Sequence, residues 1–158
     1  MQENNLSYIN GYLDAFSHLN NFCNHGADFI ITCLEYQDKD TLGENIARFF
    51  PRSYQIKHEI MNNWEEEIKK TLDIYFYEFL DDSKNKVNSQ NIIWDEEKFI
   101  RENTCDRFIF LLNSILQDLE KVYYLEINPS GEFYELYYND YIFHTKTNIY
   151  FLHFGVSD

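Results

Sequence analysis

The sequence predicts an α+β domain in which five or six helices are followed by a C-terminal antiparallel meander of three or four strands. Before Lys121, apolar residues recur every three or four positions, whereas after it they alternate and aromatic and β-branched residues become frequent. Only two prolines and five glycines interrupt the 158 residues, so long regular segments are expected. The length fits a single domain, 1–158, with a helical part at 1–120 and a sheet part at 121–158.

Residues before Lys121 are expected to form only helices and loops. Thr41 and Glu44 have the spacing of a capping box, and Pro51 ends the short helix that follows. From Ile56 to Phe79 the apolar residues lie three or four apart, which is typical of one long amphipathic helix that begins at Ser53. The full set of expected helices is 5–22, a segment carrying Phe29 to Leu34, 41–50, 53–80, 92–101 and 104–120, with a polar loop at 81–91.

The C-terminal part carries strand and turn signals. Pro129 presets one dihedral angle and Gly131 accepts a positive one, so residues 128–131 predict a turn. Asn139-Asp140 and Lys146-Thr147 are expected to be further tight connections. The expected strands are 122–127, 132–138, 141–145 and 148–154.

The charge and hydropathy of the chain limit its partners. With 27 acidic and 13 basic side chains, the formal net charge is −14, which repels nucleic acid phosphates, and no basic patch offsets it. No segment approaches the roughly 18–20 apolar residues of a membrane span, and the N-terminal residues do not resemble a secretory signal. We therefore expect a cytoplasmic protein that binds neither nucleic acid nor membrane. The negative charge serves solubility, or it complements a basic partner protein.

Metal and cofactor sites are not predicted. His18, Cys23 and His25 are metal-capable, with Cys33 eight residues further on, but their spacing matches no common zinc pattern. His18 and Cys23 also share a helix face poorly, so the sequence leaves metal binding by this group open and favours its absence. An odd number of cysteines without framework spacing suggests reduced thiols.

Two histidines offer the best candidate for catalysis. His144 and His153 lie on predicted neighbouring strands, where Asp140 or Glu135 could complete an acid–base pair. No serine or cysteine nucleophile stands on a sharp glycine-marked turn. The sequence favours the other interpretation, in which both histidines pack among aromatic residues of the sheet.

Tyrosines beside carboxylates in the meander suit a protein interface, because tyrosine anchors are enriched there. The alternative is a sheet that helices cover on both faces. If the interface exists, we expect it to contain Glu135, Tyr137, Tyr138 and Asp140, with Glu65, Glu66 and Glu67 as a second patch.

The runs GEFYELYYNDYIF (131–143) and LHFGVSD (152–158) resemble small bacterial immunity proteins of polymorphic or contact-dependent toxin systems. The resemblance implies a cytoplasmic, non-enzymatic inhibitor that binds a cognate toxin domain. It transfers no functional residue, because these proteins share no active motif. Many such toxins degrade nucleic acid, so a basic toxin surface is expected. The alternatives are a small enzyme that uses His144 and His153 with a carboxylate, and an accessory or scaffold protein of a mobile element; the oligomeric state is not predicted.

Overall fold

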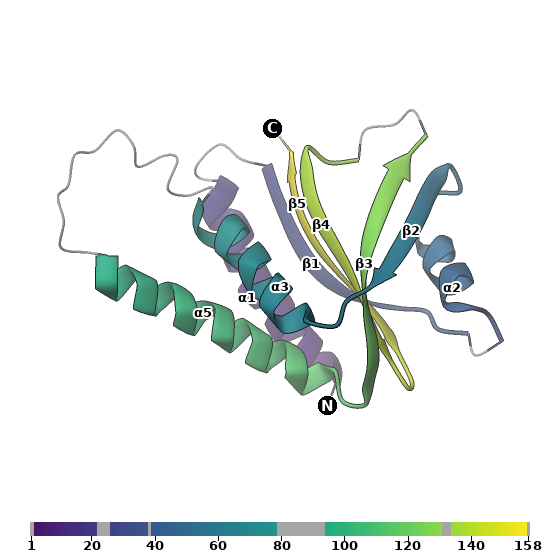
Figure 1. Ribbon diagram of the computed structural model, residues 1–158, viewed down its shortest axis with the longest axis horizontal. Helices are drawn as coiled ribbons and strands as arrows, with labels where there is room; N and C mark the ends of the chain where they lie inside the picture. The colour runs from purple at the N-terminus through teal and green to yellow at the C-terminus, as the bar shows by residue number, and fades with distance from the viewer. Residues whose placement is uncertain (1, 22–25, 38, 79–93, 131–133, 158) are drawn as a thin grey trace.

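The computed structural model is α+β, as the sequence predicts, but the numbers of helices and strands are corrected. It describes residues 2–21, 26–37, 39–78, 94–130 and 134–157, without the side chains of residues 2–4, 77, 78 and 94–101. Within these ranges there are four α-helices and one five-stranded antiparallel sheet, instead of five or six helices and three or four strands (Figure 1). No helix in these ranges is both long and apolar enough to cross a bilayer.

The five strands of the sheet lie in the order β1-β5-β4-β3-β2, and every neighbouring pair is antiparallel. The strands are β1 (Gly26–Leu34), β2 (Tyr54–Ile60), β3 (Leu119–Pro129), β4 (Tyr137–Thr145) and β5 (Ile149–Ser157). The helices are α1 (Gln2–Asn21), α2 (Leu42–Phe49), α3 (Trp64–Asp73) and α5 (Trp94–Ile115), and a π-helical turn, η1 (Ile74–Glu78), follows α3. Two strands therefore precede Lys121, where only helices and loops were predicted.

The predicted helix around Phe29 to Leu34 is wrong, because this segment is strand β1. It pairs with β5 along its whole length, from Gly26 opposite Ser157 to Leu34 opposite Ile149. Burial alternates along β1 in the manner of a strand with one covered face. A short apolar run fits a buried strand as well as a helix, and pairing with a distant strand decided between them.

The predicted helix at 53–80 is also wrong in its first part, which is strand β2. Ile56 and Ile60 are four residues apart, a spacing that puts two side chains on one face of either a helix or a strand. The helical prediction holds from Trp64, and Ile68 and Leu72 of α3 are fully buried.

Three later boundaries differ from the predictions. Helix α5 is continuous from Trp94 to Ile115, so the two helices expected at 92–101 and 104–120 are one. The segment expected as strand 132–138 is irregular at 134–136, and β4 begins only at Tyr137. Asn139-Asp140 lies inside β4 and is not a turn, whereas Lys146-Thr147 does connect β4 to β5. The predicted loop at 81–91 lies outside the described residues.

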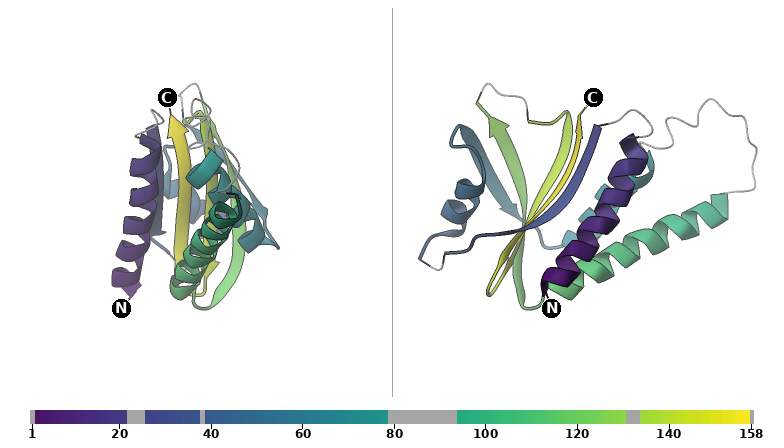
Figure 2. Two further views of the ribbon diagram at one scale, coloured as in Figure 1. Left: turned by 90° about the vertical axis from the view of Figure 1, so that its left-hand side faces the viewer. Right: turned by 180° about the vertical axis from the view of Figure 1, so that it is seen from behind.

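Both faces of the sheet are apolar and carry helices. Helices α1, α3 and α5 cover one face, which we call the first face, and α2 packs on the opposite, second face (Figures 1 and 2). On the first face, Phe76 contacts the rings of Phe29, Phe108 and Phe154 at centroid distances of 6.1–6.4 Å. On the second face, Ile46 and Phe50 pack against the sheet in a smaller cluster. This arrangement explains why aromatic residues occur at both parities of β4 and β5.

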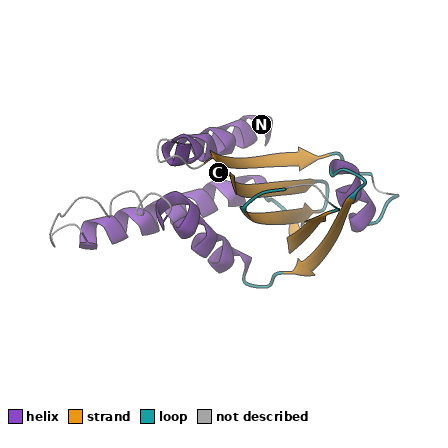
Figure 3. Cartoon of the chain, turned by 90° about the horizontal axis from the view of Figure 1, so that it is seen from above, coloured by secondary structure: helices purple, strands orange, loops and turns teal. Residues whose placement is uncertain are grey.

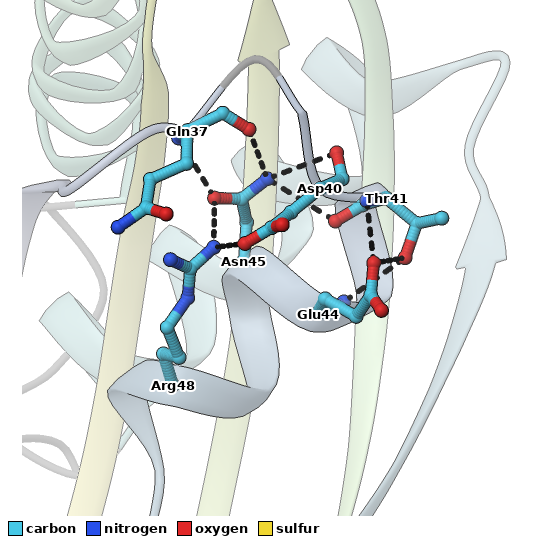
Figure 4. Close-up of polar contacts among 6 residues, drawn as sticks. All are labelled: Gln37, Asp40, Thr41, Glu44, Asn45 and Arg48. Atoms are coloured by element: carbon cyan, nitrogen blue, oxygen red, sulfur yellow. Dashed lines mark hydrogen bonds and ion pairs between the residues drawn. The ribbon is translucent and has the colours of Figure 1, made fainter.

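A polar network fixes the start of α2 (Figure 4). The predicted capping box is confirmed: the Glu44 amide donates to the Thr41 hydroxyl, and the Thr41 amide donates to the Glu44 carboxylate at 2.7 Å. The buried Asn45 side chain accepts from the Gln37 amide at 3.0 Å, and Arg48 donates to Asn45 while pairing with Asp40. These bonds tie the connection after β1 to the helix and thereby place α2 on the second face.

Helix α1 closes the outer edge of β1. The Asn10 side chain donates to the Ile31 carbonyl and accepts from the Ile31 amide, both at 2.9 Å. Ser17 donates to the Ala27 carbonyl, and Asn21 accepts from the Ala27 amide at 2.9 Å. These side chains bind backbone groups that a further strand would otherwise use, so this edge cannot extend.

Replacing Asn10 by Ala should leave the Ile31 amide and carbonyl without partners. We expect the free energy of unfolding, measured by urea titration, to fall by about 1–3 kcal/mol. Asp14→Ala on the same helix is the matched control, because Asp and Asn have similar helix propensities and Asp14 is exposed. Equal effects of the two substitutions would contradict the edge-closing role of Asn10.

Candidate functional site

The second face is covered only in part by α2. Ile46 and Phe50 pack near Leu34 and Ile149, at one end of strands β1 and β5. Toward the other end, Asp28 is exposed and Ile30 is 40% exposed. Four polar side chains gather at this end: Tyr134, Glu135, Asp140 and His153, which we call the His153 cluster.

Asp140 and His153 form a buried pair at the centre of this cluster. They lie directly opposite each other on β4 and β5, and Nδ1 of His153 is 2.6 Å from Oδ1 of Asp140. The Asp140 side chain is fully buried. The Tyr134 hydroxyl donates to its second oxygen, Oδ2, at 2.9 Å. Both oxygens of this buried carboxylate therefore have hydrogen-bond partners, as a buried carboxylate requires.

The groups around His153 favour the protonated form of its imidazole. Burial alone lowers the pKa of the imidazole, but the hydrogen bond and charge of Asp140 outweigh it. The charges of Asp28 and Glu135 act in the same direction, so the pKa of His153 is raised above its ordinary value of 6.5. Nδ1 then donates to Asp140, as in a charge-assisted pair.

Glu135 is the part of the cluster that lacks a partner. Its Oε2 atom is buried and has no hydrogen-bond partner within the described part of the chain. Burial raises the pKa of Glu135, and the nearby Asp28 and Asp140 carboxylates raise it further against the opposing charge of His153. Glu135 thus carries an unfilled acceptor site beside a partly open surface.

Gly155 makes room for these side chains. A Cβ atom added there would lie 2.4 Å from Nε2 of His153 and 3.1 Å from the carboxyl carbon of Glu135. Any other residue would displace one of them. We did not predict Gly155 as a site residue, although a glycine inside an apolar strand often indicates close approach of other groups.

Apolar side chains border the cluster. Phe49, at the end of α2, is 46% exposed, and its ring lies 5.2 Å from that of Phe151. Phe151 in turn stacks on His153 at 6.0 Å. We define the second-face patch as Asp28, Ile30, Phe49, Glu135 and His153, which combines a polar floor with exposed apolar side chains. We did not predict Asp28, Ile30 or Phe49, because these residues come together only through the sheet register and the placement of α2.

The residues predicted for a partner interface do not form one surface. Glu135 lies in the second-face patch, and Asp140 is buried beneath it. Tyr138 is half-buried and donates to the Ile127 carbonyl at 2.7 Å. Tyr137 is 58% exposed, and strand alternation places its side chain on the first face. Glu135, two residues earlier, can lie on the second face because the chain before β4 is irregular and does not follow the alternation of the strand.

The predicted second patch also lies apart from the cluster. Glu65, Glu66 and Glu67 are exposed on α3, in the helix layer of the first face. Glu65 accepts from Asn113 at 2.9 Å, and Glu67 pairs with Lys70 at 2.6 Å. The sheet therefore separates these glutamates from the second-face patch.

The structure does not bring the two candidate histidines together. His144 lies opposite Ile149, and its ring is 6.0 Å from Tyr36, toward the covered end of the second face. Of the possible metal ligands, Cys23 and His25 lie outside the described residues, while His18 and Cys33 are exposed. Among the residues that the structure describes, no group of three or more His, Cys, Asp or Glu side chains could hold a metal ion.

A comparison with protein-family models, curated proteins and solved structures finds no match to this chain.

Gly155→Ala should displace the imidazole of His153 from Asp140. We expect the pKa of His153, followed by NMR titration, to fall, and the free energy of unfolding to drop by about 1–3 kcal/mol through overpacking. Gly43→Ala is the control, because a Cβ added at that helical position meets nothing within 4 Å and should stabilise α2 by about 0.5–1 kcal/mol. If the pKa of His153 is the same in Gly155→Ala as in wild type, the contact between His153 and Asp140 does not depend on the absence of a side chain at Gly155.

The raised pKa values of Glu135 and His153 mean that the folded state binds more protons than the unfolded state. Their contribution to stability is full below the ordinary values of 4.5 and 6.5 and is lost as the pH rises through the higher folded values. In urea titrations from about pH 4 to pH 8, wild type should lose stability relative to Glu135→Gln. The exposed Glu120→Gln controls for the removal of one negative charge. A wild-type advantage that grows with pH would contradict this sign.

Proposed function

We propose that this chain is a cytoplasmic, non-enzymatic immunity protein that binds and neutralises a basic toxin domain, with the second-face patch as its contact surface. The observation that carries the proposal is the buried, unpartnered Oε2 of Glu135 beside exposed apolar side chains. An unsatisfied buried acceptor is costly, and a donor from a bound partner would remove that cost.

The charge of the patch favours a cationic donor. The carboxylates of Asp28, Glu135 and Asp140 all act on His153. One protonated imidazole offsets only one of them, so the patch stays negative when they are ionised. An arginine or lysine of the partner would form a charge-assisted hydrogen bond with Glu135.

The apolar border supplies the second component of an interface. Ile30 and Phe49 are each roughly half exposed and flank the polar floor. Apolar anchors around a buried charged contact exclude water and strengthen it. The net charge of −14 would steer a basic partner toward the protein from a distance. The proposed partner is therefore a protein with a basic active surface, such as a nuclease toxin.

The burial of each predicted residue sets its proposed role. Glu135 contacts the partner, whereas Asp140 acts from beneath by holding His153 in place. Tyr137, together with Glu65, Glu66 and Glu67, faces away from the patch and would belong to a separate contact. Tyr138 supports Tyr134, whose ring is 4.8 Å away.

Glu135→Lys should abolish most of the affinity for the toxin domain, because it places a cation where the partner supplies one. We expect the dissociation constant of the complex to rise by at least about 30-fold. Co-expression first tests whether the chain suppresses the toxicity of the protein encoded by the neighbouring gene. Calorimetric titration of the two purified proteins then measures the dissociation constant of the complex.

The matched control is Glu120→Lys, an equal charge change at an exposed position on β3. Equal affinities of the two variants would reject the second-face patch as the contact surface. Failure to suppress toxicity and to form a complex would reject the immunity function itself.

A second candidate, a small enzyme, is favoured by one observation: the 2.6 Å contact of Asp140 and His153 has the geometry of an oriented acid–base pair. The two candidates separate on His153→Gln. An enzyme would lose turnover of its substrate with this change and keep it with His144→Ala. An immunity protein would show no turnover in wild type or in either variant, and weaker partner binding in His153→Gln would agree with the place of His153 in the second-face patch.

A further inference from the structure

The two edges of the sheet differ in whether side chains of a helix bind the outward backbone groups. The edge at β1 is closed by Asn10, Ser17 and Asn21 of α1, whereas β2 forms the opposite edge (Figure 3). The Met61 amide donates to the Val122 carbonyl at 2.9 Å. The backbone groups of successive residues in an antiparallel strand point alternately toward and away from the neighbouring strand. Since those of Met61 point toward β3, those of Ile56, His58 and Ile60 point away from it.

The outward backbone groups of Ile56, His58 and Ile60 have no hydrogen-bond partner in the part of the chain that the structure describes, whereas the amide of Tyr54, at the start of β2, donates to the Pro51 carbonyl at 3.0 Å. The side chains of Lys57, His58 and Glu59 are exposed, and Ile60 is 58% exposed. An open edge of this kind is a template for another strand.

The sequence of β2 is self-complementary in one antiparallel register. When two copies of β2 meet with His58 opposite His58, the outward-facing residues Ile56, His58 and Ile60 of each copy exchange backbone hydrogen bonds. Lys57 then lies opposite Glu59 of the second copy on one face, and Ile56 lies opposite Ile60 of the second copy on the other. By symmetry each of these side-chain pairs occurs twice, and opposite charges or apolar residues placed this way stabilise strand pairing.

We propose that the chain forms a symmetric dimer by antiparallel pairing of β2 with β2 of a second copy, which joins the two five-stranded sheets into one. The occupant of this edge is a second copy because its sequence matches the edge on the outer side: a foreign strand would offer Lys57, whose inner neighbour on β3 is Glu126, no matched charge across the new contact, and an edge lysine without one discourages pairing. The second copy supplies Glu59 at that position.

The dimer has to form in spite of the charge of −14 on each copy. At about 0.15 M salt, charges more than about 8 Å apart are largely screened, whereas the pairs between Lys57 and Glu59 are in direct contact. An edge-to-edge contact buries little surface, so the association should be reversible, with a dissociation constant in the micromolar range.

Sedimentation equilibrium of the full chain tests the proposal. We expect wild type to be dimeric at about 100 μM and His58→Pro to be monomeric, because proline removes the central outward donor. The fold should tolerate proline there, since the lost amide faces solvent. His58→Ala keeps the amide and should remain dimeric. A wild type that stays monomeric, or a His58→Pro variant that stays dimeric, would overturn the proposal.

A charge exchange identifies the register. Lys57→Glu and Glu59→Lys each place like charges opposite each other in a homodimer, so each variant alone should be monomeric. In an equimolar mixture, the two variants present opposite charges and should form a one-to-one heterodimer. Circular dichroism verifies that both are folded, because Lys57 also pairs with Glu126 of its own chain at 3.2 Å. A mixture that stays monomeric while wild type dimerises would refute this register.

Discussion

The antiparallel pairing of β1 with β5 is the constraint on which the rest of this structure depends. It joins residues 26–34 to the C-terminal residues 149–157 and so commits the chain to a single sheet built from both halves. Because β1 lies at the edge, α1 can pack on the first face and also bind the outer backbone groups of Ala27 and Ile31. The same pairing puts Ile30 opposite His153, where the second-face patch forms.

The His153 cluster shows how a buried ionisable group can be tolerated in a sheet rich in aromatic residues. Asp140 has donors on both oxygens, and its negative charge favours the protonated imidazole. Such networks are costly when one member lacks a partner. Glu135 is that member, and its unpaired buried oxygen is the observation from which we propose that the cluster forms half of an intermolecular contact.

Much of the local structure could be predicted from the sequence. The first helix, the capping box at Thr41, the helix from Trp64 and the strand-rich C-terminal part all follow from apolar spacing and turn chemistry. The two helices predicted in place of strands fall where two structures share one pattern. Ile56 and Ile60 fit a strand as well as a helix, and the segment around Ile30 carries no periodicity that distinguishes them. A contact with a distant strand, which no local pattern records, resolved both.

The candidate site divides in the same way. The sequence by itself determined the acidic charge, the α+β class and the prominence of Glu135, Asp140 and His153, because these depend on composition and short-range order. Only the tertiary structure decided that Asp140 is buried, that His153 rather than His144 contacts it, and that Tyr137 lies on the opposite face. The physical reason is that an irregular turn before β4 and the register of three strands set which side chains meet, and both depend on packing across the whole chain.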